Sequence, residues 1–187
     1  MIGVGDTSLD NVIELATYAE NTKADTLNII SLYYFGLNKE STVSYFGEIS
    51  KHIKLPIMLY NFPDRTGNDL SPDLVFELVS KYPNIIGIKD TVDNISHTRQ
   101  LCQKIKPNYP QFSILSGFDK YYVVNRISGS DGALYGLTNI IPEDFVKLHK
   151  AFEEKDFNTM EIAAKKIAHL MQLYQTTPLF VVGIKQR

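Results

Sequence analysis

The chain alternates short apolar segments with amphipathic segments, and this alternation constrains its fold more than any other feature. Apolar runs bounded by Pro, Gly and polar residues are typical of buried parallel strands, whereas apolar residues at helical spacing indicate amphipathic helices. About six strand–helix units follow one another, which predicts an α/β fold with a parallel sheet. The strands are expected at residues 2–5, 26–32, 56–60, 85–89, 112–117 and 132–136, and the helices at 9–19, 40–53, from 71 onward, 95–105, 121–127 and 142–154.

Two architectures are built from serial units of this kind, a doubly wound open sheet and a closed (β/α)₈ barrel. Both place functional side chains at the carboxyl ends of the strands, but a barrel converges several strands on one pocket. Six units are two fewer than a closed barrel needs. A longer amphipathic helix is expected at 157–174, outside the alternation. Polar and aromatic residues do follow the expected strands, namely Tyr33, Tyr34, Tyr60, Lys89, Ser116, Gly117 and Asn139.

The composition is that of an ordinary globular protein, with 187 residues, 44% hydrophobic content and a net charge of −2. Lys and Arg are spread along the chain and no apolar run approaches the roughly 18 residues of a membrane span, so we expect neither a nucleic-acid nor a membrane partner. The single Cys102 allows no internal disulfide and fits a cytoplasmic protein. The histidines show no ligand spacing, so no metal site is predicted; they are His52, His97, His149 and His169.

Lys89 ends the expected strand at 85–89 and is the first candidate for chemistry. Strand alternation would place Ile85, Gly87 and Lys89 on one face, with Ile86 and Ile88 on the other. The same alternation turns the next residue, an aspartate, away from the lysine. Burial among apolar neighbours favours the neutral amine, which is the form that a Schiff-base nucleophile needs. The alternative is a lysine that extends from a strand end into water without a catalytic role.

Two motifs together identify a family. The segment Tyr-Asn-Phe-Pro-Asp-Arg-Thr-Gly at 60–67, followed by Gly-Ile-Lys-Asp-Thr at 87–91, resembles the dihydrodipicolinate synthase/N-acetylneuraminate lyase family. The resemblance implies a (β/α)₈ barrel and a pyruvate-dependent lyase or aldolase. It extends through most of the chain, since the segments at 3–5, 33–34, 116–117 and 132–139 also resemble segments of the family. It further implies a partial catalytic barrel at 1–155 and the start of a C-terminal helical extension at 156–187.

The resemblance also implies roles for five residues. Lys89 would form the Schiff base with pyruvate, Tyr60 would be the proton shuttle beside it, and no separate cofactor would be needed. Arg65 would hold the carboxylate of an aldehyde substrate, and the backbone carbonyl of Leu134 would face the substrate. Tyr34 would be lent across a subunit interface, as in a homo-oligomer built as a dimer of dimers. Without the motifs, Tyr60 would be interpreted as core packing and Arg65 as a solvated side chain.

The chain also departs from the family pattern. Its first strand resembles the third strand of the family, so two strand–helix units and a threonine pair that would hold pyruvate are expected to be absent. We therefore expect an incomplete member that is weakly active or inactive alone. In addition, Leu32 replaces a proline before the tyrosine pair, and Tyr135 replaces a residue that is often small.

Several reactions remain open. Arg65 within Asp-Arg-Thr-Gly favours a 4-hydroxy-tetrahydrodipicolinate synthase, which condenses pyruvate with aspartate semialdehyde in lysine biosynthesis. The segment Lys89-Asp90-Thr91 also resembles 2-keto-3-deoxy sugar acid aldolases, and an N-acetylneuraminate lyase-like activity is a further alternative. An alternative of another class is an inactive barrel fragment that acts as an assembly partner, with its aromatic loop at 33–35 as the contact.

Overall fold

The computed structural model describes residues 1–185, which form a six-stranded parallel sheet with helices between the strands. The strands are β1 (Ile2–Val4), β2 (Leu27–Ile30), β3 (Ile57–Asn61), β4 (Ile85–Asp90), β5 (Ser113–Ser116) and β6 (Gly132–Ala133). The α-helices are α1 (Leu9–Asn21), α2 (Lys39–His52), α3 (Pro63–Thr66), α4 (Pro72–Lys81), α5 (Ile95–Ile105), α6 (Tyr122–Ile127), α7 (Pro142–Glu153), α8 (Phe157–Leu170) and α9 (Phe180–Lys185). The 3₁₀ helices are η1 (Asp119–Tyr121), η2 (Leu137–Asn139) and η3 (Met171–Gln175).

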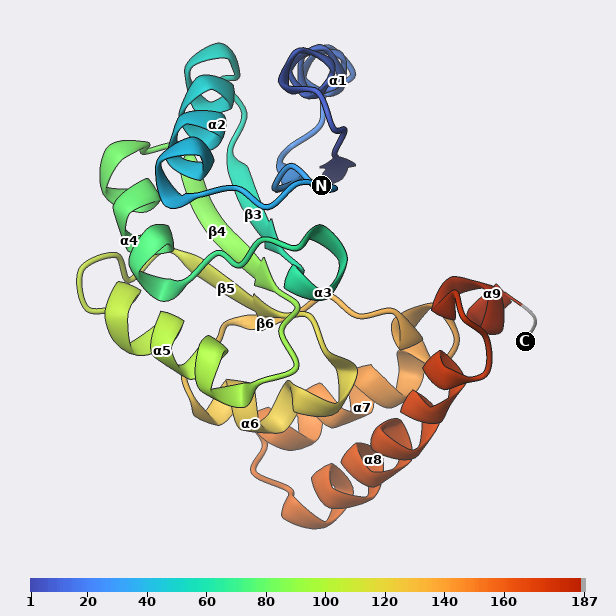
Figure 1. Cartoon of the computed structure of the whole chain (residues 1–187). Helices are drawn as coiled ribbons and strands as arrows, with labels where there is room; N and C mark the ends of the chain where they lie inside the picture. The colour runs from blue at the N-terminus through green and yellow to red at the C-terminus, as the bar shows by residue number, and fades with distance from the viewer. Residues whose placement is uncertain (186–187) are drawn as a thin grey trace.

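The order of the strands decides between the two architectures. The strands lie in the sequence order β1-β2-β3-β4-β5-β6 and every pair is parallel. A doubly wound sheet reverses its strand order at a switch point, and no reversal occurs among the described strands. Because right-handed crossovers in one direction bring the connecting helices to the same side, α1, α2, α4, α5 and α6 line one side of a curved sheet (Figure 1). This is the arrangement of a partial (β/α)₈ barrel, which confirms the predicted fold.

The main core lies between the outer face of the sheet and the surrounding helices. Along each strand, side chains that point into this core alternate with side chains that point to the inside of the curved sheet. Each fully buried aliphatic side chain contributes roughly 1.5–3 kcal/mol relative to leaving it in water. Fully buried members of this core include Leu27, Ile29, Leu59, Ile88 and Ile114 from the strands, and Phe46, Ile49, Leu78, Leu101 and Ile105 from the helices.

The register of β3 and β4 contains one extra residue. Ile57 pairs with Ile85 but Met58 pairs with Gly87, so Ile86 is the additional residue of a β-bulge and is 37% exposed. The expected face of Ile85 is therefore wrong: it lies opposite Ile57 in the main core, on the same side as Ile88. Beyond the bulge the alternation holds.

Most element boundaries lie within two residues of the prediction, but two elements end at least three residues early. The strand expected at 132–136 ends at Ala133, because β5 stops at Ser116 and the chain then enters η2. The helix expected at 157–174 ends at Leu170 and continues as the tighter η3. The predicted boundary at residue 155 falls in the short connection between α7 and α8, and residues 186 and 187 of the predicted extension lie outside the described residues.

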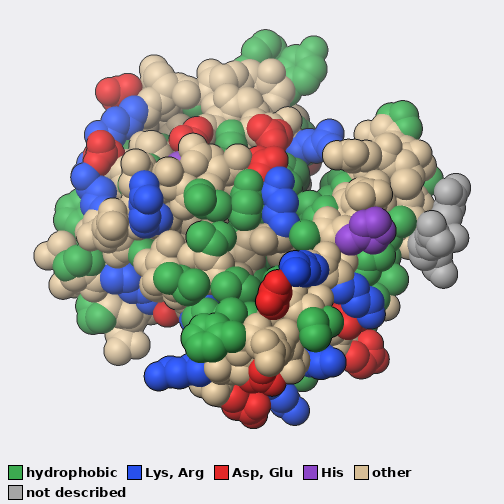
Figure 2. Space-filling model, turned by 90° about the horizontal axis from the view of Figure 1, so that it is seen from below, with side chains coloured by type: hydrophobic (Ala, Val, Ile, Leu, Met, Phe, Trp, Pro, Cys, Tyr) green, Lys and Arg blue, Asp and Glu red, His purple; other side chains and the backbone are tan. Residues whose placement is uncertain are grey.

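The C-terminal helices form a second cluster against the end of the sheet. Its buried members are Tyr122, Tyr135, Leu137, Phe145, Leu148, Ala163 and Ile167. The outer face of this region mixes charges of both signs with apolar side chains (Figure 2). No helix within residues 1–185 combines the length and the apolar character needed to cross a membrane.

Close packing inside the curve of the sheet makes Gly87 sensitive to substitution. A methyl group at Gly87 would lie 2.6 Å from the Ser113 carbonyl oxygen and would collide with the Met58 sulfur. We expect Gly87→Ala to lower the free energy of unfolding by about 1–3 kcal/mol, the usual cost of overpacking, as measured by urea denaturation. Gly3→Ala is the control because no atom lies within 4 Å of its added methyl group. Equal losses in the two variants would contradict the packing argument.

Candidate active site

The carboxyl ends of the central strands open into a cavity of about 320 Å³. Lys89 enters it from β4 and Tyr60 from β3, while Asp119 and Leu134 follow β5 and β6. The cavity is also lined by Phe62, Asp64, Arg65, Thr91, Gly117, Phe118, Tyr135, Gly136, Tyr174 and Phe180. Four of the five predicted site residues, from three separate segments of the chain, therefore line one cavity.

Lys89 and Tyr60 are direct neighbours in the sheet. Their strands pair them in register, and the Lys89 Nζ lies 4.0 Å from the centroid of the Tyr60 ring. Burial lowers the pKa of Lys89 to about 8, although the negative charge of Asp119 opposes this shift. A much larger fraction of the amine is therefore neutral near pH 7 than for an ordinary lysine. Burial also raises the pKa of the Tyr60 phenol, partly offset by the neighbouring Thr91 hydroxyl, so the phenol keeps its proton.

Asp119 is the buried carboxylate of the cavity, whereas Asp64, which also lines it, is exposed. Its Oδ1 accepts a hydrogen bond from the Leu137 backbone N–H at 2.9 Å, and its Oδ2 accepts one from the Tyr174 hydroxyl at 2.9 Å. Burial raises the pKa of Asp119, while these two donors and the charge of Lys89 act in the opposite direction. The carboxylate is thus fixed in orientation, and it is close enough to Lys89 for their charges to interact.

Neither Asp119 nor Tyr174 was among the residues predicted from the sequence. Asp119 had a usable signal, because it is an acidic residue just beyond Ser116 and Gly117 at a strand end. Tyr174 had none, since it reaches Asp119 across 55 residues of sequence. It fits against Gly136, where an added methyl group would collide with its hydroxyl.

Arg65 lies at the rim of the cavity. It is on α3, a single helical turn from Pro63 to Thr66, which is capped by Gly67 with a φ of 71°, in the left-handed region that favours glycine. The guanidinium lies 6.0 Å from the centroid of the Phe62 ring. Exposed at the rim, it is free to bind a carboxylate through both oxygens.

Leu134 lines the cavity and its backbone N–H donates to the Ser116 carbonyl at 3.0 Å. Its predicted role, in which its own carbonyl faces the substrate, stays a prediction.

Tyr34 does not line the cavity. Its side chain is 84% exposed, its φ is 86°, and its ring packs edge-to-face against Phe35 with centroids 4.8 Å apart. The loop is held by Asn68, whose side chain accepts from the Leu37 N–H at 2.5 Å and donates to the Leu32 carbonyl at 2.6 Å. The predicted role of Tyr34 in a neighbouring subunit, and with it the homo-oligomer, stays a prediction.

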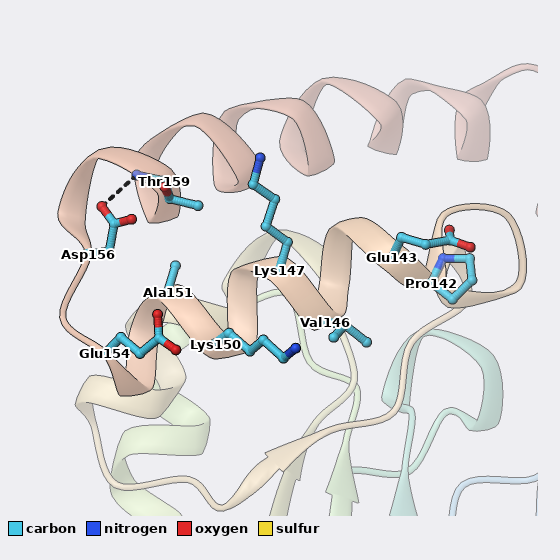
Figure 3. Close-up of a pocket in the computed structure, with 9 residues that line it drawn as sticks. All are labelled: Pro142, Glu143, Val146, Lys147, Lys150, Ala151, Glu154, Asp156 and Thr159. Atoms are coloured by element: carbon cyan, nitrogen blue, oxygen red, sulfur yellow. Dashed lines mark hydrogen bonds between the residues drawn. The ribbon is translucent and has the colours of Figure 1, made fainter.

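A larger hollow lies away from the strand ends. This open groove of about 640 Å³ runs between α7 and the start of α8, and Figure 3 shows Lys147, Lys150 and Glu154 along it. At one end Asp156 caps α8 by accepting from the Thr159 N–H at 3.1 Å. The groove is shallow and its charged side chains are exposed, so it lacks the enclosed amine and carboxylate of the smaller cavity. Within residues 1–185, no group of three or more His, Cys, Asp or Glu side chains is placed to hold a metal ion.

Comparison with known proteins agrees with the fold and with the motifs. The model of the dihydrodipicolinate synthetase family matches residues 1–187. The chain belongs to this family. The resemblance inferred from residues 60–67 and 87–91 is thereby confirmed.

Three relatives are informative. The probable 2-dehydro-3-deoxy-D-pentonate aldolase YjhH of Escherichia coli is 36% identical over 99% of this chain and 62% of its own length. The putative 2-dehydro-3-deoxy-D-gluconate aldolase YagE of E. coli is 36% identical over 100% of this chain and 62% of its length. A 4-hydroxy-tetrahydrodipicolinate synthase of Methanosphaerula palustris is 35% identical over 84% of this chain and 53% of its length.

The crystal structure of E. coli YagE in complex with pyruvate matches with a TM-score of 0.93 and 34% identity, covering 97% of this chain and 62% of that one. The chain therefore spans about 62% of the length of the two E. coli aldolases that it matches.

The buried amine should titrate differently from other lysines. We expect acetylation of Lys89 by limiting acetic anhydride to rise through a midpoint near pH 8, because only the neutral amine reacts. Asp119→Asn should move this midpoint to lower pH, since the carboxylate stabilises the ammonium. Peptide mass spectrometry across a pH series measures both.

Lys120 is the internal control for this titration. Burial lowers its pKa, but the ion pair with Asp93 and the neighbouring Tyr121 together outweigh burial and raise it above the ordinary value. A Lys89 midpoint as high as that of Lys120 would contradict the burial argument.

Proposed function

We propose that this chain carries the Schiff-base centre of a pyruvate-dependent aldolase, with Lys89 as the nucleophile. The observation that carries the proposal is the enclosed Lys89 amine, which has a pKa lowered to about 8 and lies 4.0 Å from the Tyr60 ring centroid. A neutral amine at the mouth of parallel strands can attack a keto carbon, and a phenol beside it can carry protons. Membership of the family supports the same chemistry.

The proposed reaction begins when the Lys89 Nζ lone pair attacks the keto carbon of pyruvate to form a carbinolamine. Protonation of the carbinolamine hydroxyl by the Tyr60 phenol lets water leave, which gives a cationic iminium. The iminium withdraws electrons, so the adjacent methyl group gives a proton to the Tyr60 phenolate and the iminium becomes an enamine. The enamine carbon attacks the aldehyde carbon, whose oxygen takes that proton from the Tyr60 phenol, and hydrolysis of the new iminium releases the product and restores the amine.

For the aldehyde, we propose a polyhydroxylated fragment, so that the physiological direction is cleavage of a 2-keto-3-deoxy sugar acid. The Asp119 carboxylate accepts hydrogen bonds and the Tyr174 hydroxyl can donate or accept them, and both suit substrate hydroxyls. The similarity to YjhH and YagE supports this choice. This choice places sugar-acid cleavage before the synthase reaction, whereas the motif around Arg65 favours the synthase.

The second candidate is condensation of pyruvate with aspartate semialdehyde. Arg65 at the cavity rim favours it, because this aldehyde carries a carboxylate that a guanidinium can bind through both oxygens. The similarity to the M. palustris synthase also supports it.

The covalent step is tested by trapping. Incubation of the 187-residue chain with pyruvate and cyanoborohydride should add the mass of one reduced pyruvate, located on Lys89 by peptide mass spectrometry. Lys89→Arg should give no adduct, because a guanidinium is not a nucleophile at neutral pH. Lys120→Arg is the matched control and should keep the adduct. Trapping suits this chain because a single covalent event is counted and turnover is not required. An adduct that persists in Lys89→Arg would refute the assignment.

The choice of aldehyde is tested with Arg65→Ala. Loss of a charged, bidentate contact costs about 1.5–3 kcal/mol, so the KM for aspartate semialdehyde should rise roughly 10- to 100-fold. Cleavage of 2-keto-3-deoxy-gluconate, whose aldehyde fragment has no carboxylate, should change little. Coupled assays of both reactions decide between the candidates. Condensation with aspartate semialdehyde in the absence of keto-deoxy-gluconate cleavage would favour the synthase.

A further inference from the structure

A second pair of side chains lies next to Tyr60 and Lys89, on the opposite face of the sheet. Asn61 and Asp90 are paired in register at the ends of β3 and β4, and they are only 1% and 2% exposed. The Asn61 Nδ2 donates to the Asp90 Oδ1 at 3.1 Å. Asp90 therefore points away from the amine, as the sequence predicted, but it is buried and bonded to the neighbouring strand.

The first turn of α5 provides two further partners for Asp90. The Thr98 hydroxyl donates to the Asp90 Oδ2 at 2.7 Å, and the His97 Nδ1 lies 3.0 Å from the same oxygen. On its other side, the His97 Nε2 lies 3.4 Å from the Asp69 Oδ1. Burial alone would lower the pKa of His97, but the two carboxylates outweigh it and raise the pKa to about 10. His97 is thus a buried cation between two acids.

The main chain ties the same three strand ends together. The Thr91 N–H donates to the Asn61 carbonyl at 2.8 Å, and the Gly117 N–H donates to the Asp90 carbonyl at 2.8 Å. A shift of the end of β4 would break these bonds and would also separate Asp90 from His97. Loss of one partner of a buried ion pair is costly because the other charge is left uncompensated.

We propose that Asp90 and His97 are positioning residues, which lock the end of β4 so that the Lys89 amine stays beside the Tyr60 ring. The proposal rests on the proposed role of Lys89 as the nucleophile. Neither residue lines the cavity, so both act through the backbone that directly follows Lys89, and His97 acts through Asp90. Displacement of a reacting group by about 1 Å can slow a reaction by roughly 100-fold, so this anchoring matters for the rate.

The first test measures the rate of pyruvate trapping in Asp90→Asn, His97→Asn and His97→Leu. At saturating pyruvate, the rate constant should fall on the order of tenfold in Asp90→Asn and His97→Leu, and less in His97→Asn, whose amide keeps a donor for Asp90 at the Nδ1 position. The pyruvate concentration at half-maximal rate and the final adduct per folded molecule should not change. If the two residues had a purely structural role, the variants would contain fewer folded molecules and would form less adduct in total. The rate constant of the molecules that remain folded would then be unaltered.

Asn84 offers a matched control at the other end of the same strand. It precedes β4, and its Nδ2 donates to the Ser50 and Ile53 carbonyls at 3.1 and 3.0 Å. Asn84→Ala should therefore lower stability through lost, partly buried hydrogen bonds without displacing Lys89. A rate loss equal to that of His97→Leu would contradict the proposal.

A second readout does not depend on the reaction. Because the Lys89 amine lies beside the Tyr60 ring, the ring current should shift the Lys89 Cε proton signals upfield in protein labelled with ¹³C-lysine, and Lys89→Arg assigns them. The shift should shrink in Asp90→Asn and His97→Leu and persist in Asn84→Ala. If the unaltered chain forms no adduct, the proposed function fails, but this shift still tests the positioning. An unchanged shift in both Asp90→Asn and His97→Leu would overturn the inference.

Discussion

An ammonium group loses much of its hydration when it is enclosed at the end of a parallel strand, and the surroundings of Lys89 can be understood as responses to that loss. The Tyr60 ring lies beside the amine and can interact with its charged form, while Asp119 provides an opposite charge in the same cavity. These partners compensate only in part, since the pKa of Lys89 remains lowered to about 8. The amine is therefore poised between its two forms near physiological pH, which suits its proposed role as a nucleophile that must also become a cation.

At the carboxyl ends of β3 and β4, the two faces of the sheet carry different kinds of side chain. Tyr60 and Lys89 face the cavity, while Asn61 and Asp90 face the helices. Because neighbouring residues on a strand point to opposite sides, the cavity-facing pair and the buried polar pair are only one residue apart in sequence. The buried polar pair can therefore lie close to the proposed nucleophile without adding its charges to the cavity.

The parts of the fold and site that follow from local sequence were predictable. Serial strand–helix units predicted the parallel sheet. The motifs at 60–67 and 87–91 pointed to Tyr60, Arg65 and Lys89, which line the same cavity. Tyr174 was not predictable, because its contact with Asp119 depends on how the C-terminal helices pack. The early end of β6 depends on its pairing with β5, which the apolar pattern does not reveal. Likewise, nothing in the run Ile85-Ile86-Gly87-Ile88 indicates which residue is extra.

That extra residue sets the alignment of the site. With Ile86 bulged out, Tyr60 lies opposite Lys89; in an unbroken ladder from the Ile57–Ile85 pair, Tyr60 would lie opposite Ile88, and Asn61 opposite Lys89. The Lys89 amine would then lie beside Asn61, and the Tyr60 phenol would point to the opposite face of the sheet. The pairing of phenol and amine thus depends on the number of residues in β4. If that number changed, no substitution of a single side chain could restore the pairing. Among related chains, a one-residue insertion or deletion before this lysine would be a more drastic change than most substitutions in the cavity itself.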